Sequence, residues 1–531
     1  MRLPSHVRAR TPSSQCGTSV GRRHTYLPRH RLPAVADVLY RLENRTYNGM
    51  EGMARLSAAH LILLLEKPGL ACTRAEYAVK GRILLINPWI YDFAAYCEWS
   101  EPLGLLSVAA VLVENGYDVA LIDCLDRHHP QLPSKPREDD YGRGKFLKTL
   151  VEKPPVLSRV QRRYGRYGLP VEVFEEELAR QPLPDIIMVT SGMTYWYPGP
   201  FEVIKRVKAR FPGVPVILGG VYPTLCPDHA QEKSGADHIV TGEGELEALR
   251  LVDELTGNGS DYRRYTRDLD SLPWPLHELR RNQGYAAIQT SRGCPFRCTY
   301  CASSLLHPRG FRRRDPHRVA DEIELCRTEL GIHDFAFYDD ALLADAAGHL
   351  HVLLDKVLQR GLDCRFHTPN GLHARYVDPP LASKMYEAGF KTIRLGLETS
   401  DADEQRRTGS KVSSEHFRSA VRALQAAGFE ARQIAAYVLM GLPGQSVQGV
   451  LDSVDFAHEC GALVQIEAIS LIPGTREWER AALRGHVDRS VDPLLHNDSI
   501  YPFSWCEASM DDFQTAKARA TAGNRALAAD S

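Results

Sequence analysis

The stretch SRGCPFRCTYCASS at residues 291–304 places Cys294, Cys298 and Cys301 close together in a chain with 12 cysteines among 531 residues. Chance rarely produces such a group, so the spacing indicates a shared chemical role. A structural zinc site needs four ligands, and His307 is a candidate for the fourth. An iron–sulfur cluster held by three thiolates leaves one iron open for another molecule. A disulfide is disfavoured because it strands one thiol.

Two α/β segments position this loop. Residues 82–256 alternate strand-like and helix-like stretches, beginning RILLINPW, PLGLLSVAAVLVENG and DVALIDC. Apolar strands interleaved with helices predict a doubly wound parallel sheet, which binds ligands beyond the carboxyl ends of its strands. Ligand contacts are therefore expected from the residues that follow the strands: Pro88, Ser191, Gly192, Gly219, Gly220, Gly242, Glu243 and Gly244. Glycine permits close approach of a ligand to the backbone, although it also suits tight turns.

A second alternation runs through residues 284–475, with strand-like stretches from YAAIQTS to VQIEAISLIP. Right-handed βα crossovers curl such a chain into a partial (β/α)6 barrel. The three cysteines follow its first strand, at the carboxyl-end rim where such barrels hold their chemistry. The predicted fold class is therefore α/β, with an N-terminal doubly wound sheet followed by a partial barrel.

The chain divides into five predicted parts. Residues 1–78 form a basic leader, expected to be disordered, with nine Arg, no Lys and three acids in its first 53 residues. The sheet domain spans 79–259, a polar linker 260–283, the barrel 284–475, and a C-terminal extension 476–531 whose end is expected to fray. An insertion at 127–184, rich in Arg, Lys, Pro and Tyr, is interpreted as a lid or a docking surface.

Composition narrows the function classes. The formal net charge is −1, so no overall field attracts nucleic acid or anionic lipid. The apolar run at 58–65 is too short to span a membrane, and export through it is disfavoured. Scattered cysteines without a disulfide framework favour a reducing compartment. We expect a cytoplasmic protein with no nucleic-acid partner and no membrane span.

CPFRCTYC resembles the CxxxCxxC cluster loop of the radical S-adenosylmethionine (SAM) enzymes, including the aromatic Tyr300 before the last cysteine. The resemblance extends over residues 285–475. It implies that Cys294, Cys298 and Cys301 hold a [4Fe–4S] cluster and that SAM chelates the open iron. It also implies that an electron from the cluster cleaves SAM, giving a 5′-deoxyadenosyl radical that abstracts hydrogen from substrate.

The same resemblance implies further contacts with SAM. FYDDALL stands where the family meets the amino group, although the literal Gly-Gly-Glu is absent, and LGLETS stands at the ribose position. MGLPGQ and IPGT resemble the loops that pack on adenine. The implied set is Tyr300, Asp339, Asp340, Asn370, Glu398, Gly441, Pro443 and Pro473. Ordinary alternatives exist, because buried carboxylates cap helices or pair with Arg and Asn-Gly is a turn signal.

Residues 81–475 as a whole resemble the subgroup with an N-terminal cobalamin-binding domain, in the order INPW, PLGLLSVAAVL, LGGVYPTL and VTGEGELEAL. This implies that methylcobalamin donates a methyl group to the substrate radical and that a second SAM restores it. The loop WIYDFAAYCEW lacks the cobalt-ligating histidine of D-x-H-x-x-G modules, as do many members of the subgroup. DRHHPQ at 126–131 follows the second strand and lacks the glycine. Cobalamin is expected to bind without that ligand; loss of the site is the alternative.

The leading hypothesis is a cobalamin-dependent radical SAM methyltransferase. It would act on an unactivated carbon of a small molecule or peptide and receive electrons from a donor such as flavodoxin or ferredoxin. The alternatives are a cobalamin-independent radical rearrangement, cyclisation or oxidation, and a non-enzymatic iron–sulfur or corrinoid sensor. Tyr195, Trp196 and Tyr197 either stack on a corrin or substrate or pack between domains.

Overall fold

The structure is a computed structural model that describes residues 79–281, 284–498, 500, 506 and 508–529. The predicted leader, residues 1–78, lies outside the described residues. None of the helices in the described part of the chain is long and apolar enough to cross a membrane.

The N-terminal sheet has five parallel strands in the spatial order β10-β9-β8-β1-β4. The strands are β1 (Arg82–Asn87), β4 (Asp118–Asp123), β8 (Ile186–Val189), β9 (Val216–Leu218) and β10 (His238–Ile239). Numbered along the chain, this is the doubly wound order 2-1-3-4-5, and the connections diverge between β1 and β8. Ligands of such sheets bind outside the carboxyl ends at this switch point.

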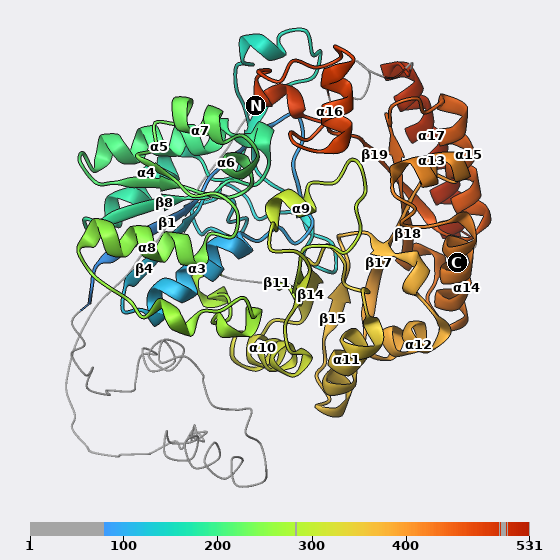
Figure 1. The fold of residues 1–531 in the computed structure, drawn as a ribbon, viewed down its shortest axis with the longest axis horizontal. Helices are drawn as coiled ribbons and strands as arrows, with labels where there is room; N and C mark the ends of the chain where they lie inside the picture. The colour runs from blue at the N-terminus through green and yellow to red at the C-terminus, as the bar shows by residue number, and fades with distance from the viewer. Residues whose placement is uncertain (1–78, 282–283, 499, 501–505, 507, 530–531) are drawn as a thin grey trace, which may run out of the picture. The chain divides into compact units, whose positions relative to one another are not determined.

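Helices cover both faces of this sheet (Figure 1). One face carries α3 (Leu103–Glu114) and α8 (Glu245–Thr256), and the other α4 (Val171–Arg180) and α5 (Pro198–Arg210). Short α6 (Val221–Leu225) and α7 (Pro227–Lys233) follow β9. Strand β1 is apolar on both sides because Ile83 and Leu85 pack with α3 while Leu84 and Ile86 pack with α5. The continuous apolar run in its sequence reflects this double burial.

The second half forms another parallel sheet in the order β11-β14-β15-β17-β18-β19, with short β16 beside β17. The strands are β11 (Tyr285–Ile288), β14 (Asp334–Phe337), β15 (Arg365–His367), β16 (Leu372–His373), β17 (Phe390–Glu398), β18 (Ile434–Met440) and β19 (Leu463–Ala468). Neighbouring strands follow chain order, as in a βα barrel, and the sheet is open between β11 and β19. Each of the main strands falls in a stretch predicted from sequence.

The barrel helices lie along the outer side of its strands (Figure 1). They are α10 (Pro316–Glu329), α11 (Leu350–Gln359), α12 (Pro379–Glu387), α14 (Ser414–Ala426) and α15 (Val447–Glu459). The short α13 (Ala402–Thr408) follows β17 instead at the carboxyl end of the barrel, where the Thr408 carbonyl accepts the Thr299 N–H of the cysteine loop. Asp315 and Ser413 cap α10 and α14, and the side chain of each accepts a hydrogen bond from a backbone N–H. Apolar strand residues such as Phe335 and Leu395 face these helices, and the alternate positions therefore face the barrel interior.

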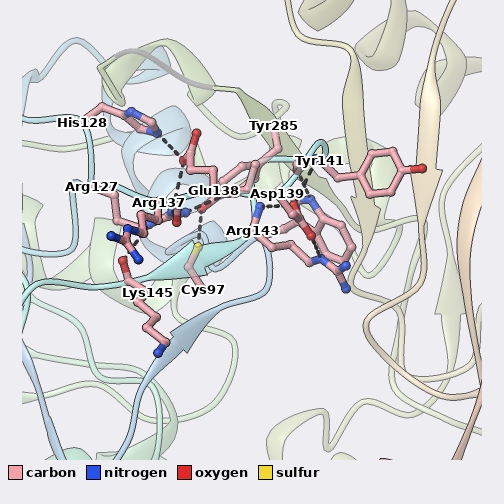
Figure 2. Close-up of polar contacts among 12 residues, drawn as sticks. Cys97, Arg127, His128, Arg137, Glu138, Asp139, Tyr141, Arg143, Lys145 and Tyr285 are labelled. Atoms are coloured by element: carbon pink, nitrogen blue, oxygen red, sulfur yellow. Dashed lines mark hydrogen bonds and ion pairs between the residues drawn. The ribbon is translucent and has the colours of Figure 1, made fainter. Parts of the chain in front are cut away.

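The insertion docks the sheet domain onto the barrel. It contains β5 (Gly144–Lys145), β6 (Lys148–Leu150) and β7 (Gly165–Tyr167), which pair with β2 (Ile90–Asp92) and β3 (Tyr96–Cys97). Figure 2 shows its first part, where Glu138 contacts Arg127 at 3.1 Å and His128 at 2.9 Å. The ring of Tyr141 lies 5.1 Å from that of His367 on β15. The Trp99 ring, from the loop after β3, stacks on the same imidazole at 4.2 Å.

The C-terminal extension is ordered further than the sequence predicts. Helices α16 (Arg476–Leu483) and α17 (Met510–Ala529) follow the barrel, and α17 packs against α15 and β19. The expectation of a frayed end is therefore wrong through residue 529. The helix buries Phe513, Ala516 and Ala520, and small alanines give only a weak apolar pattern in the sequence.

Candidate functional site

A cavity of about 430 Å³ lies at the carboxyl ends of the N-terminal sheet. On that side it is lined by seven of the predicted ligand residues: Pro88, Ser191, Gly192, Gly220, Gly242, Glu243 and Gly244. Gly219 is not among the lining residues, and its carbonyl accepts the hydroxyl of Ser191 at 3.0 Å. The barrel contributes Gln289, Arg292, Leu306, His307 and Tyr338. The cavity therefore joins the ligand end of the sheet to the cysteine side of the barrel.

The loops on the sheet side are shaped by backbone contacts. The Ser191 hydroxyl also accepts the Tyr222 backbone N–H at 3.1 Å, so this side chain is engaged within the protein. Gly220 has φ 98°, and a Cβ there would collide with the Ser191 carbonyl oxygen. Only glycine fits both restrictions, and the wall of the cavity consists largely of backbone at this point.

Charged pairs hold the cavity wall against the barrel. Glu243 is paired with Arg312, and His307 Nδ1 lies 3.4 Å from the same carboxylate. Burial alone raises the pKa of Glu243, but the bond from His307 and the charges of Arg292 and Arg312 outweigh it and lower the pKa to about 2. The neighbouring Glu245 contacts Arg292 at 2.5 Å. The carboxylate of Glu243, predicted as a cobalamin contact, is thus already engaged with the barrel.

The three cysteines line a second pocket of about 310 Å³, together with Arg297 and Arg476. All three are free thiols. Across the described residues, no group of three His, Cys, Asp or Glu side chains is arranged to hold a single metal ion. A [4Fe–4S] cluster fits this donor set, since each thiolate binds a different iron and the sulfurs need not converge on one point.

The cysteine loop is anchored on two sides. The Thr299 backbone N–H donates to the Thr408 carbonyl at 3.0 Å, and its own carbonyl accepts from the Glu477 N–H at 3.1 Å. Because iron binds cysteine as the thiolate, each of these thiols must lose its proton, which makes cluster assembly dependent on pH.

Glu398 stands beside the cysteines at the carboxyl end of β17. Its φ of 66° is unusual for a non-glycine residue, and its carboxylate accepts a hydrogen bond from Lys411 Nζ at 2.8 Å. Burial raises the pKa of the Cys298 thiol, and the Lys411 charge offsets part of this increase. Gly396 makes room for the pair, because a Cβ there would lie within 3 Å of both charged groups. The resemblance places the ribose contact at Glu398.

The two aspartates after β14 have different surroundings. Asp339 is buried and accepts hydrogen bonds from the Thr290 N–H at 3.0 Å and the Thr290 hydroxyl at 2.7 Å. Burial raises the pKa of Asp339 to about 6 despite these bonds. Asp340 instead accepts the Ser303 hydroxyl at 2.6 Å, close to the cysteine loop, and Asn370 donates to the Asp339 carbonyl at 3.2 Å. Asp340 therefore has the more accessible carboxylate of the two predicted acceptors of the SAM ammonium.

The remaining predicted SAM residues lie on the loops that follow β18 and β19. Tyr300 packs against an apolar cluster that includes Leu442, Leu471 and Trp478. The Gly441 N–H donates to Gln445 Oε1 at 2.9 Å, and Gly441 has φ 102°. Pro443 and Pro473 are partly exposed. The last two barrel loops therefore contact the cysteine loop through Tyr300.

Buried charges connect the two sheets through the linker. The His277 imidazole lies between two carboxylates, with Nδ1 3.1 Å from Glu101 and Nε2 3.1 Å from Glu322 on α10. Burial lowers the pKa of His277, but the two carboxylates outweigh it and raise the pKa to about 10. Glu101 lines the large cavity. The segment predicted as a polar linker is therefore joined by buried ion pairs to both domains.

The aromatic loop lies partly at the cavity and partly against the rest of the protein. Trp196 lines the cavity and donates its indole N–H to Asp92 at 2.8 Å. Tyr195 is buried, and the Tyr197 hydroxyl donates to Asp492 of the C-terminal extension at 3.1 Å. One aromatic side chain thus faces the cavity while its neighbours pack against protein.

Sequence reasoning missed two basic residues near the cysteines. Lys411 is one, and His373 on β16 is the other, with Nε2 3.9 Å from Cys294 Sγ. Burial and the charges of Lys411 and Arg375 lower the pKa of His373 to about 3, so its ring is neutral. Lys411 lies beyond the carboxyl end of β17, and His373 lies in a two-residue strand, so neither belongs to a motif with a recognisable spacing. Only their place at the barrel rim could have indicated a functional role.

Two parallel α/β domains that share a cavity beside a three-cysteine loop define a cofactor-binding protein of two domains. Residues 288–457 match the model of the radical SAM superfamily, and residues 167–252 match the model of the B12 binding domain. These two matches show a radical SAM domain preceded by a B12-binding domain.

Named relatives agree with this assignment. The chain is 25% identical over 390 residues to the uncharacterized methyltransferase PH0819 of Pyrococcus horikoshii, covering 64% of this chain and 83% of the relative. It is 22% identical over 473 residues to cytidylyl-2-hydroxyethylphosphonate methyltransferase of Streptomyces wedmorensis, covering 77% and 83%.

Solved structures share the fold. The radical SAM methyltransferase TsrM from Kitasatospora setae superposes with a TM-score of 0.57 at 17% identity, covering 76% of each chain. The cobalamin-dependent SAM radical enzyme OxsB superposes with a TM-score of 0.58 at 15% identity, covering 82% of this chain and 66% of that one. At these identities the likeness establishes the fold.

Proposed function

We propose that this chain is a cobalamin-dependent radical SAM methyltransferase that acts on an unactivated carbon. The observation that carries the proposal is the cavity lined on one side by the glycine loops of the B12-binding domain and on the other by barrel residues next to the cysteine loop. Two cofactors bound at these places would face one substrate between them. The names of the relatives, several of which are methyltransferases, support the same reaction class.

The residues have distinct roles in this proposal. Cys294, Cys298 and Cys301 hold the cluster, Glu398 accepts hydrogen bonds from the ribose of SAM, and Asp340 accepts its ammonium. When bound, the cluster supplies one electron for SAM cleavage and the corrinoid supplies the methyl group. Per methylation, one SAM yields methionine and 5′-deoxyadenosine, a second yields S-adenosylhomocysteine, and the donor provides two electrons.

The partners follow from this chemistry. The electron donor is a flavodoxin or a ferredoxin, and the substrate is a small molecule or a peptide. We also propose that the protein works in the cytoplasm, where a reducing environment keeps the cluster thiols free. Nothing in the net charge supports a nucleic-acid substrate.

The test is a product assay. The protein is reconstituted anaerobically with iron, sulfide and cobalamin and then given SAM and a chemical reductant. Formation of both 5′-deoxyadenosine and S-adenosylhomocysteine is expected, because the two SAM roles give different products. 5′-Deoxyadenosine alone would leave radical chemistry without methylation, and neither product would favour the sensor.

A further inference from the structure

His373 contacts the first cysteine of the cluster loop. It ends β16, a two-residue strand paired with Leu395 and Gly396 of β17, and the residue is 2% exposed. Its Nε2 lies 3.9 Å from Cys294 Sγ, across 79 residues of sequence. The thiol therefore lies within the longer hydrogen-bonding reach of a sulfur atom from Nε2.

The imidazole is held in this orientation by the loop itself. Phe296, two residues after Cys294, stacks on the His373 ring with centroids 4.6 Å apart and an interplanar angle of 22°. The Arg375 guanidinium lies over the Phe296 ring, 5.7 Å from its centroid, and the Tyr376 ring centroid lies 6.2 Å from the same ring. The His373 ring therefore packs directly on the cysteine loop, and it cannot rotate away from Cys294 without losing its stacking contact with Phe296.

The chemistry of such a contact follows from charge. A cysteine that binds iron does so as a thiolate, and a neutral imidazole has one N–H that either ring nitrogen can carry. The tautomer with hydrogen on Nε2 directs that N–H at the sulfur. Hydrogen bonds to cluster sulfurs are among the levers that set reduction potentials, because they stabilise the more negative, reduced cluster.

We propose that His373 donates its Nε2–H to the Cys294 thiolate and raises the reduction potential of the cluster. This inference rests on the proposed function, since it requires that the three cysteines hold a [4Fe–4S] cluster. His373 acts through the ligand and is a positioning residue. By favouring the reduced cluster, the bond would let a physiological donor load the electron that SAM cleavage needs.

The test is a potentiometric titration of the reconstituted holoprotein, followed by the EPR signal of the reduced cluster. His373→Phe keeps the stacking surface and removes the N–H, whereas His373→Gln keeps a donor. Tyr376→Phe is the matched control, since it alters the same aromatic group without touching a thiol. At a fixed potential, the reduced-to-oxidised ratio of His373→Phe is expected to fall about tenfold, as for a charge-assisted hydrogen bond. A tenfold change corresponds to 59 mV for a one-electron couple.

Electron–nuclear double resonance in H₂O and D₂O gives an independent readout. An exchangeable proton coupled to the cluster is expected in the wild type and in Tyr376→Phe and absent in His373→Phe, and His373→Gln is expected to restore part of the potential. If His373→Phe binds full iron and sulfide with an unchanged potential and the same proton coupling, the inference is wrong. Failure of the wild type to bind a cluster would instead refute the proposed function.

Discussion

Replacing His277 by Gln tests the buried ion pairs through which the linker joins the two domains. His277 is 2% exposed and bridges Glu101 and Glu322. A pKa raised from 6.5 to about 10 corresponds to about 5 kcal/mol at 1.36 kcal/mol per pKa unit. Removing one partner of a buried ion pair typically costs about 3–5 kcal/mol. We therefore expect His277→Gln to lower the free energy of unfolding by about 3–5 kcal/mol at pH 6.

The pH dependence gives the sharper result. Because the folded pKa lies above the unfolded value, the contribution of His277 is complete below pH 6.5 and is lost as pH rises towards 10. The urea midpoint of the wild type should therefore approach that of the variant between these pH values. His333→Gln, a half-exposed histidine 3.7 Å from Asp363, is the control and should change stability by less than about 0.5 kcal/mol. Equal midpoints at pH 6, or parallel curves across the range, would refute the reasoning.

Three further predictions concern the two cavities and their charges. Cys298→Ala should lose most of the cluster iron and all 5′-deoxyadenosine formation, whereas Cys460→Ala, at a thiol outside the pocket, should retain both by iron assay and chromatography. Gly220→Ala should weaken corrinoid binding at least about tenfold in an equilibrium titration, because the added Cβ would collide with the Ser191 backbone. Gly213→Ala is the control: it also has a positive φ, of 83°, but its Cβ would meet open space, so it should bind corrinoid as the wild type does. Glu243→Gln should lower the free energy of unfolding by about 3 kcal/mol above pH 4.5. The wild type loses this contribution as the pH falls towards 2, so the acid unfolding curves of the two proteins should converge at low pH. Curves that stay apart at pH 2 would contradict this.

The sequence predicts the frame of the site because local patterns determine it. Continuous apolar runs such as residues 83–86 mark strands buried on both faces, and capping residues such as Ser413 mark where helices begin. Strand order and the carboxyl-end rule then place the cysteine loop and the glycine loops without any coordinates. Seven of the eight residues expected on the sheet side line the cavity for this reason.

The remaining features depend on contacts between distant residues. Glu243 follows a strand like its neighbours, but its carboxylate pairs with Arg312, 69 residues away. Asp339 and Asp340 are adjacent in sequence, yet only the structure separates the buried carboxylate from the accessible one. His373 reaches Cys294 because a two-residue strand brings it there, and no periodic pattern marks so short an element.

The most direct test of the central claim is the number of corrinoids bound per chain. The protein is purified anaerobically from cells supplied with cobalamin, iron and sulfide, and bound corrinoid is measured by its absorption spectrum alongside iron. Near one corrinoid per chain is expected in the wild type, with loss in Gly220→Ala. A chain that carries a complete cluster and cleaves SAM but binds no corrinoid would contradict the claim that the large cavity serves methyl transfer.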